Sequence, residues 1–192
     1  PFARRLKLEA MTTTTAERYR AYQGHPLFSM GFRPFFLLAT LWAALVVPVW
    51  VAAFAGWLPI EHFNRDWHAH EMLLGFATGV IVGFLLTAVK AWTGLQTPRG
   101  AALGALVLLW LVARVAAWVA PYPVYAALDV VLLPAVAVIL VRILLRAGNK
   151  RNLPLAGILI LLSVANLVFH LSVMGWLALP PSSALYAALG LI

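Results

Sequence analysis

Long apolar stretches separated by short polar loops constrain this chain more than any other feature of its sequence. A helix that crosses the hydrocarbon core of a bilayer needs about 20 mostly apolar residues. The sequence has five such stretches and the start of a sixth near Ser183. The five complete stretches are Phe35–Trp57, His70–Val89, Ala101–Ala120, Val124–Leu145 and Pro154–Leu177. Because the connections are short, we predict an all-α, polytopic transmembrane helix bundle in which neighbouring helices are antiparallel.

Composition supports a membrane protein and excludes several other classes. Of the 192 residues, 64% are hydrophobic and 10% are charged, whereas soluble domains have about 25% charged residues. The net charge of +8 does not indicate nucleic-acid binding, because no basic stripe with interleaved aromatic residues is present. The chain has no cysteine, which excludes disulfides and thiolate ligands. No phosphate-binding glycine loop, HExxH sequence or Ser-His-Asp set indicates a particular enzyme.

The basic residues predict the orientation of the bundle. Twelve of the fourteen precede the first span or lie in the loops after the second and fourth spans. They are Arg4, Arg5, Lys7, Arg18, Arg20, Arg33, Lys90, Arg99, Arg142, Arg146, Lys150 and Arg151. Because Lys and Arg concentrate in cytoplasmic loops, the N-terminus is predicted to be cytoplasmic. The predicted outer interface has a belt of aromatic residues: Trp57, Trp67, Trp118, Tyr122, Tyr125 and Trp176.

The chain divides into two regions. Residues 1–34 are interpreted as a basic cytoplasmic segment and residues 35–192 as the transmembrane bundle. The last apolar run continues to Ile192, so we expect the sequence to be truncated at the C-terminal end, with Met11 as a candidate natural start. The expected partners are the lipid bilayer and either the remainder of the same polypeptide or a second copy.

The sequence DWHAHE at residues 66–71 places ionisable groups at the start of the second span. Ionisable residues inside a bilayer are costly and usually face a bundle interior or a functional site. We predict Asp66 as the helix N-cap, with His68, His70 and Glu71 in the first turns. In a regular helix His68 and His70 point in nearly opposite directions. They would bind one metal ion together only if His68 were still in extended chain.

The fifth span carries a further histidine, His170, at about the depth predicted for His70. It belongs to a series at helical spacing with Ser163, Asn166 and Met174. Two histidines at one depth on two spans can hold a metal ion or a haem iron between helices. The alternative for His170 alone is a hydrogen-bonded core residue. Met174 is either a packing residue or a soft ligand for copper.

Two other charged residues lie within spans at matching depths. Arg114 is in the third span and Asp129 in the fourth, which predicts a buried ion pair. The alternative is that Arg114 donates hydrogen bonds to a haem propionate. Arg33 is interpreted as an orientation anchor at the cytoplasmic mouth of the first span.

Glu71 heads a stripe of small residues along the second span, which consists of Gly75, Gly79, Gly83 and Thr87. Such a stripe allows close approach of another backbone or of a flat ligand. Ordinary helix packing is the plainer interpretation.

Several motifs together resemble the NnrS family. They are GFRPFFLLA (31–39), WHAHEMLLGF (67–76), GFLLTAVKAWTG (83–94), the Arg114 and Asp129 pair, and NLVFH (166–170). The resemblance runs in order from about Pro26 onward, and the combination of WHAHEM with GFRPFF is specific. One departure is Lys90-Ala91, where members usually have Pro-Asn before Trp-Thr-Gly; it lies at the predicted cytoplasmic end, away from the histidines.

The resemblance implies a multi-pass bacterial inner-membrane protein that contains haem and copper and is associated with resistance to nitric oxide and nitrosative stress. This chain would be its N-terminal half. His70 and His170 would then be ligands, and His68 and Glu71 would be either further ligands or supporting residues. Asp129 and Asn166 would support the ligands. Nitric oxide would be a partner.

Two other functions are compatible with the same residues. In a transporter or a proton or ion channel, Arg114, Asp129 and the outer histidines would line a polar path. Because these polar residues cluster toward the outer side, and Pro134 alone offers a central kink, the sequence argues against transport. In a structural subunit, the Arg114–Asp129 pair would serve assembly alone.

Overall fold

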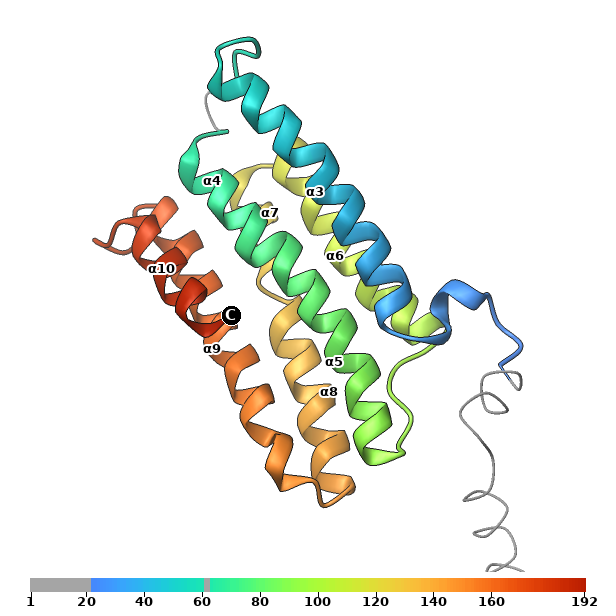
Figure 1. The fold of residues 1–192 in the computed structure, drawn as a ribbon. Coiled ribbons are helices and arrows are strands. Elements are labelled where there is room, and N and C mark those ends of the chain that lie inside the picture. The colour runs from blue at the N-terminus through green and yellow to red at the C-terminus, as the bar shows by residue number, and fades with distance from the viewer. Residues whose placement is uncertain (1–21, 61–62) are drawn as a thin grey trace, which may run out of the picture.

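The computed structural model describes residues 22–60 and 63–192 of the chain, and every regular element in them is helical (Figure 1). The predicted basic residues up to Arg20, together with Glu61 and His62, lie outside the described residues. The elements in order are η1 (Pro26–Ser29), α3 (Phe32–Phe54), α4 (Arg65–His70), the π-helical segment η2 (Glu71–Ala77), α5 (Thr78–Thr93), α6 (Ala101–Val119), α7 (Tyr122–Asp129), α8 (Leu132–Arg146), η3 (Lys150–Asn152), α9 (Leu153–Val173) and α10 (Pro181–Leu191).

Among the described residues, five helical segments are long and apolar enough to cross a membrane, which confirms the predicted fold class. They are Phe32–Phe54, Arg65–Thr93, Ala101–Val119, Tyr122–Arg146 and Lys150–Val173. The beginning of a sixth helix, expected near Ser183, is α10. The helix of the first span begins at Phe32, slightly before the predicted start at Phe35. The chain is therefore a multi-pass membrane protein.

The second span begins earlier than predicted, and its N-cap is a different residue. The helix starts at Arg65, where the side chain of Asn64 accepts a hydrogen bond from the backbone N–H of Trp67 at 2.9 Å. The prediction of Asp66 as the cap is wrong because Asn caps as well as Asp and Asn64 has the extended backbone that a cap needs. Asp66 lies in the first turn instead, where a carboxylate faces the positive end of the helix.

The long helices α3, α5, α6, α8 and α9 lie side by side, and α10 packs along α9 (Figure 1). The described basic residues of the predicted cytoplasmic loops collect at one end of the bundle, which we call the basic end: Arg33, Lys90, Arg99, Arg142, Arg146, Lys150 and Arg151. Residues 64–71 lie at the opposite end. Which end faces the cytoplasm stays a prediction.

Two of the five described spans depart from regular α-helix in their interior, and both departures lie beside polar residues. The fourth span breaks at Val130–Val131, between α7 and α8. Pro134 explains this break, because it has no N–H to bond to the carbonyl of Val130 and its ring crowds that carbonyl. The second span is π-helical over η2, where Trp110 Nε1 donates to the Gly75 carbonyl at 3.1 Å. The Thr78 hydroxyl donates to the Leu74 carbonyl in the same segment. Such π-helical turns are rare and often occur at functional sites.

The stripe of small residues on the second span is filled by neighbouring helices. A Cβ atom on Gly83 would lie 2.8 Å from the Cβ of Phe35 on α3, and one on Gly79 would lie 3.3 Å from Trp110 Nε1 on α6. The hydroxyl of Thr87 accepts a hydrogen bond from the backbone N–H of Phe32 at 3.0 Å. The stripe therefore serves helix packing, as the plainer interpretation held.

The predicted aromatic belt is wrong for two of its members. Trp57 and Trp176 are 78% and 72% exposed, as residues of an interfacial belt should be. Tyr125 and Trp67, however, are buried in the bundle, at 3% and 9% exposure. Tyr125 turns inward because it shares a helix face with Asp129, one turn later in α7.

Candidate functional site

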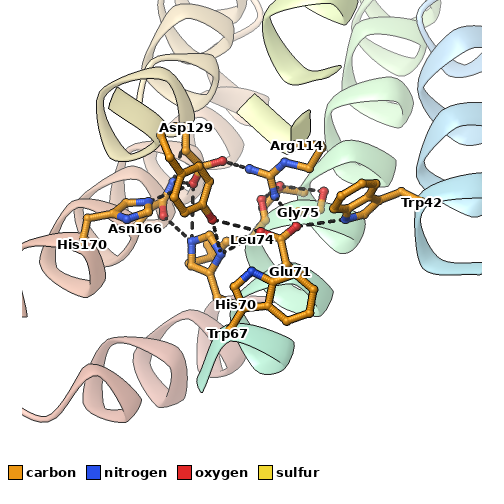
Figure 2. A network of polar contacts seen from close by, with 12 residues as sticks. Trp42, Trp67, His70, Glu71, Leu74, Gly75, Arg114, Asp129, Asn166 and His170 are labelled. Atoms are coloured by element: carbon orange, nitrogen blue, oxygen red, sulfur yellow. Dashed lines mark hydrogen bonds and ion pairs between the residues drawn. The ribbon is translucent and has the colours of Figure 1, made fainter. Parts of the chain in front are cut away.

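A cluster of polar side chains from four spans lies in the bundle interior (Figure 2). It lies toward the end opposite the basic end. The second span contributes His70 and Glu71, and the third contributes Arg114. The fourth contributes Tyr125 and Asp129, and the fifth contributes Asn166 and His170. All seven are buried. In a membrane protein, such a group of ionisable residues marks a functional site by default.

Arg114 joins two carboxylates that come from different spans. Its Nη1 donates to Glu71 Oε2 at 2.8 Å, and its Nη2 is ion-paired with Asp129 Oδ1. The predicted buried pair of Arg114 and Asp129 is confirmed, and the structure adds Glu71 as a second partner. Trp42 Nε1 also donates to Glu71 Oε2, at 2.9 Å.

Because Gly75 has no side chain, Arg114 and Glu71 have the space to form their ion pair. A Cβ atom on Gly75 would lie 2.4 Å from Arg114 Nη1 and 2.8 Å from Glu71 Oε2. Any side chain at this position would therefore displace the ion pair. The glycine stripe thus has one member whose role is electrostatic as well as steric.

The two predicted histidines meet beside Asp129. His170 Nε2 lies 3.1 Å and His70 Nε2 lies 3.4 Å from Asp129 Oδ2. The candidate ligand atoms of these three residues all lie within 4.8 Å of one another. Asn166 links them further, because its Nδ2 donates to Asp129 Oδ2 at 2.8 Å while its Oδ1 lies 2.9 Å from His70 Nε2. The predicted match in depth between the second and fifth spans thus brings the imidazoles together.

His70, Asp129 and His170 together form a candidate metal centre. Two imidazole nitrogens and one carboxylate oxygen are a ligand set that suits copper, zinc or iron. Around them, the two carboxylates of Glu71 and Asp129 face one guanidinium, so with neutral imidazoles the cluster carries one excess negative charge. An uncompensated charge in an apolar interior is costly, and a bound cation would compensate it.

His68 does not join this centre. Its ring stacks on Trp50 of α3, with 4.0 Å between ring centroids. The helix has already begun at Arg65, so His68 points away from the face that carries His70. Met174 is the C-cap of α9, beyond His170. Arg33 lies at the basic end, where its Nη1 donates to the Pro26 carbonyl at 3.0 Å.

Two tyrosines of the site were not predicted. The hydroxyl of Tyr125 donates to Glu71 Oε1 at 2.9 Å and lies 3.1 Å from His70 Nδ1. The hydroxyl of Tyr122 lies 2.9 Å from His170 Nδ1. A usable signal was the spacing of Tyr122, Tyr125 and Asp129, which places them near one face of a helix.

The pair of histidines fits a single metal ion better than a haem held between them. A porphyrin between the two imidazoles would need an open plane, but the side chains of Asp129 and Asn166 bridge the two Nε2 atoms. Both terminal nitrogens of Arg114 already face carboxylates, so neither is directed toward a propionate. These residues therefore do not fit a haem at this place.

The fold and the centre together define a multi-pass membrane helix bundle with a buried His-Asp-His group. A family model described as "NnrS protein" matches residues 26–192. The chain belongs to the NnrS family, as its motifs indicated. No curated protein and no solved structure matches the sequence.

Proposed function

We propose that the chain belongs to a bacterial inner-membrane protein that binds copper at His70, Asp129 and His170 and takes part in the response to nitric oxide and nitrosative stress. The observation that carries the proposal is the buried group of three ligand atoms within 4.8 Å of one another. Family membership supports the choice of copper and of the physiological role. The basic end is proposed to face the cytoplasm, which places the copper centre toward the outer side.

The residues around the centre hold its ligands in place. Arg114 engages Asp129 through Oδ1, which leaves Oδ2 as the oxygen nearest the two imidazoles. Tyr125 and Tyr122 contact the Nδ1 atoms of His70 and His170, so the Nε2 atoms are the ones that face Asp129. Such outer contacts fix the orientation of histidine ligands. A bound copper ion would supply one-electron chemistry and a position for a small ligand such as nitric oxide.

The haem that the resemblance implies is not assigned to His70 and His170. The bridging side chains of Asp129 and Asn166 support this separation of copper from haem. A Soret band that survives in the His70→Ala and His170→Ala variants would agree with it. Loss of the Soret band in either variant would contradict this separation and would indicate that the histidine is a haem ligand.

Copper analysis of the detergent-purified full chain tests the proposal. We expect about one copper per chain in the wild type and a loss of most of it in His70→Ala and in His170→Ala, because ligands are lost directly. His25→Ala is the matched control, since His25 is exposed and caps η1 far from the centre. A folded wild-type protein without copper, or variants with wild-type copper content, would contradict the proposal.

The physiological part has a separate test. A strain that lacks the gene should grow poorly under a nitric oxide donor, and the wild-type gene should restore growth. The His70→Ala gene should not restore growth, whereas the His25→Ala gene should. If a variant without copper restored growth, the stress response would not depend on the metal centre.

A further inference from the structure

A cavity of about 520 Å³ lies beside the polar cluster, at the end of the bundle opposite the basic end. It is partly open and is bordered by α4, the end of α6, the start of α7, the end of α9 and the start of α10. Five aromatic side chains form much of its wall: Trp67, Trp118, Tyr122, Tyr125 and Phe169. Cavities that bind small organic molecules have about this volume, about 300–1,000 Å³, and mostly apolar and aromatic walls.

Three residues of this wall carry buried polar atoms that have no hydrogen-bond partner within the described part of the chain. They are Trp67 Nε1, Trp118 Nε1 and Ser172 Oγ. An indole N–H can only donate, and a buried donor without an acceptor destabilises the protein. The atoms themselves are covered within the wall. Because the three residues that carry them line one cavity, we take them to indicate an occupant that brings acceptor atoms.

The charged residues that line the cavity indicate which kind of molecule it can bind. Among the described residues that line the cavity, none is Lys, Arg or His, and Asp66 is the charged one. A carboxylate or phosphate would therefore meet no cation and one like charge. The occupant is expected to be uncharged, with acceptor atoms of the carbonyl kind. A flat ring would also pack well against indole and phenol rings.

We propose that this cavity binds an uncharged, flat aromatic molecule with carbonyl oxygens, the chemistry of a quinone head group. Its donors would be the indole N–H groups of Trp67 and Trp118 and the hydroxyl of Ser172, which are covered in the structure and would turn toward the occupant. Its place at the ends of the helices suits a lipid-soluble molecule that enters from the bilayer. The cavity also adjoins the copper centre, because Tyr122 both lines it and contacts His170.

Binding of ubiquinone-1, a quinone with a short tail, tests this proposal. The dissociation constant is measured by equilibrium dialysis on the detergent-purified full chain. This method does not use tryptophan fluorescence, which the tryptophan variants would themselves change. We expect saturable binding, and a Kd raised about two- to tenfold in Ser172→Ala and in Trp118→Phe, because each removes one neutral donor and keeps the shape of the wall. The bulkier variant Ala117→Phe, which fills the cavity, should abolish binding.

Matched controls separate the cavity from the rest of the chain. Ser163→Ala changes a serine of the same helix that does not line the cavity, and Trp176→Phe changes an exposed tryptophan. Both should bind ubiquinone-1 like the wild type. Absence of saturable binding, or equal Kd values in all variants, overturns the proposal. Displacement of ubiquinone-1 by haemin, with haemin binding weakened in the same variants, would also overturn it and assign the cavity to a porphyrin.

Discussion

The two halves of this bundle are built from the same helices but are stabilised in different ways. Toward the basic end, α5, α8 and α9 meet through fully buried leucines: Leu86, Leu140, Leu144, Leu159 and Leu162. Toward the opposite end, the same spans meet through ion pairs and hydrogen bonds around Arg114 and Asp129. The apolar half depends mainly on the fit of its side chains, whereas the polar half depends on every partner being present.

This difference also bears on the choice between functions. In a transporter or channel, a polar substrate would also have to pass the apolar half of the bundle. Here the described polar cluster lies toward one end of the bundle, and the buried leucines of the apolar half lie between it and the basic end. The arrangement therefore favours a centre that holds a ligand in place over a path that conducts one.

The largest effect is expected when the bridge between the two carboxylates is removed. Arg114→Ala leaves Glu71 and Asp129 as buried carboxylates without a facing arginine, which should destabilise the protein by about 3–5 kcal/mol. Thermal unfolding in detergent and the level of folded protein measure this effect. Arg146→Ala removes an exposed arginine at the end of α8 and should change little. Equal stability of the two variants would mean that the ion pairs of Arg114 do not stabilise the polar half.

A leucine of the apolar half provides the opposite test. Leu159→Ala should destabilise the protein by about 2 kcal/mol or more, because a fully buried side chain leaves a cavity. Its copper content should stay at the wild-type level, whereas His70→Ala should lose copper. Thermal unfolding and copper analysis on the same two preparations show whether packing and ligation separate in this way. Loss of copper in Leu159→Ala would show that the halves are not independent.

Two glycines, one in each half of the bundle's packing, give a comparison with a smaller expected change in stability. Gly75→Ala should destabilise the protein by about 1–3 kcal/mol, because the new Cβ would collide with Arg114 and Glu71. Gly157→Ala in α9 meets nothing within 4 Å and should stabilise its helix by about 0.5–1 kcal/mol. Unfolding temperatures of the two variants should therefore shift in opposite directions. Shifts in the same direction would contradict the close approach at Gly75.

Much of the fold was predictable because hydropathy alone determines where a helix can span a bilayer. The pairing of Arg114 with Asp129 and the approach of His70 to His170 followed from depth, which sequence position gives directly. The N-cap did not follow, because Asn64 and Asp66 are both good caps and the backbone conformation decides between them.

The parts of the site that sequence did not predict depend on contacts between distant residues. Tyrosine is a residue type that is common at membrane interfaces, so the sequence places Tyr125 there. Its side chain instead points inward to Glu71, and this direction depends on how the whole bundle packs. The π-helical segment η2 is likewise accompanied by a bond from Trp110, which is 35 positions away from Gly75. His68 shows the converse, since its separation from His70 followed from helix geometry once the start of the helix was known.

X-ray absorption at the copper edge on the purified protein tests the central claim most directly, because it reports the ligands in either oxidation state of copper. The wild type should show scattering from two imidazoles and one oxygen ligand. His170→Ala should show one imidazole fewer, and His25→Ala should match the wild type. A spectrum without imidazole scattering, or one that His70→Ala and His170→Ala leave unchanged, would contradict a copper centre at His70, Asp129 and His170.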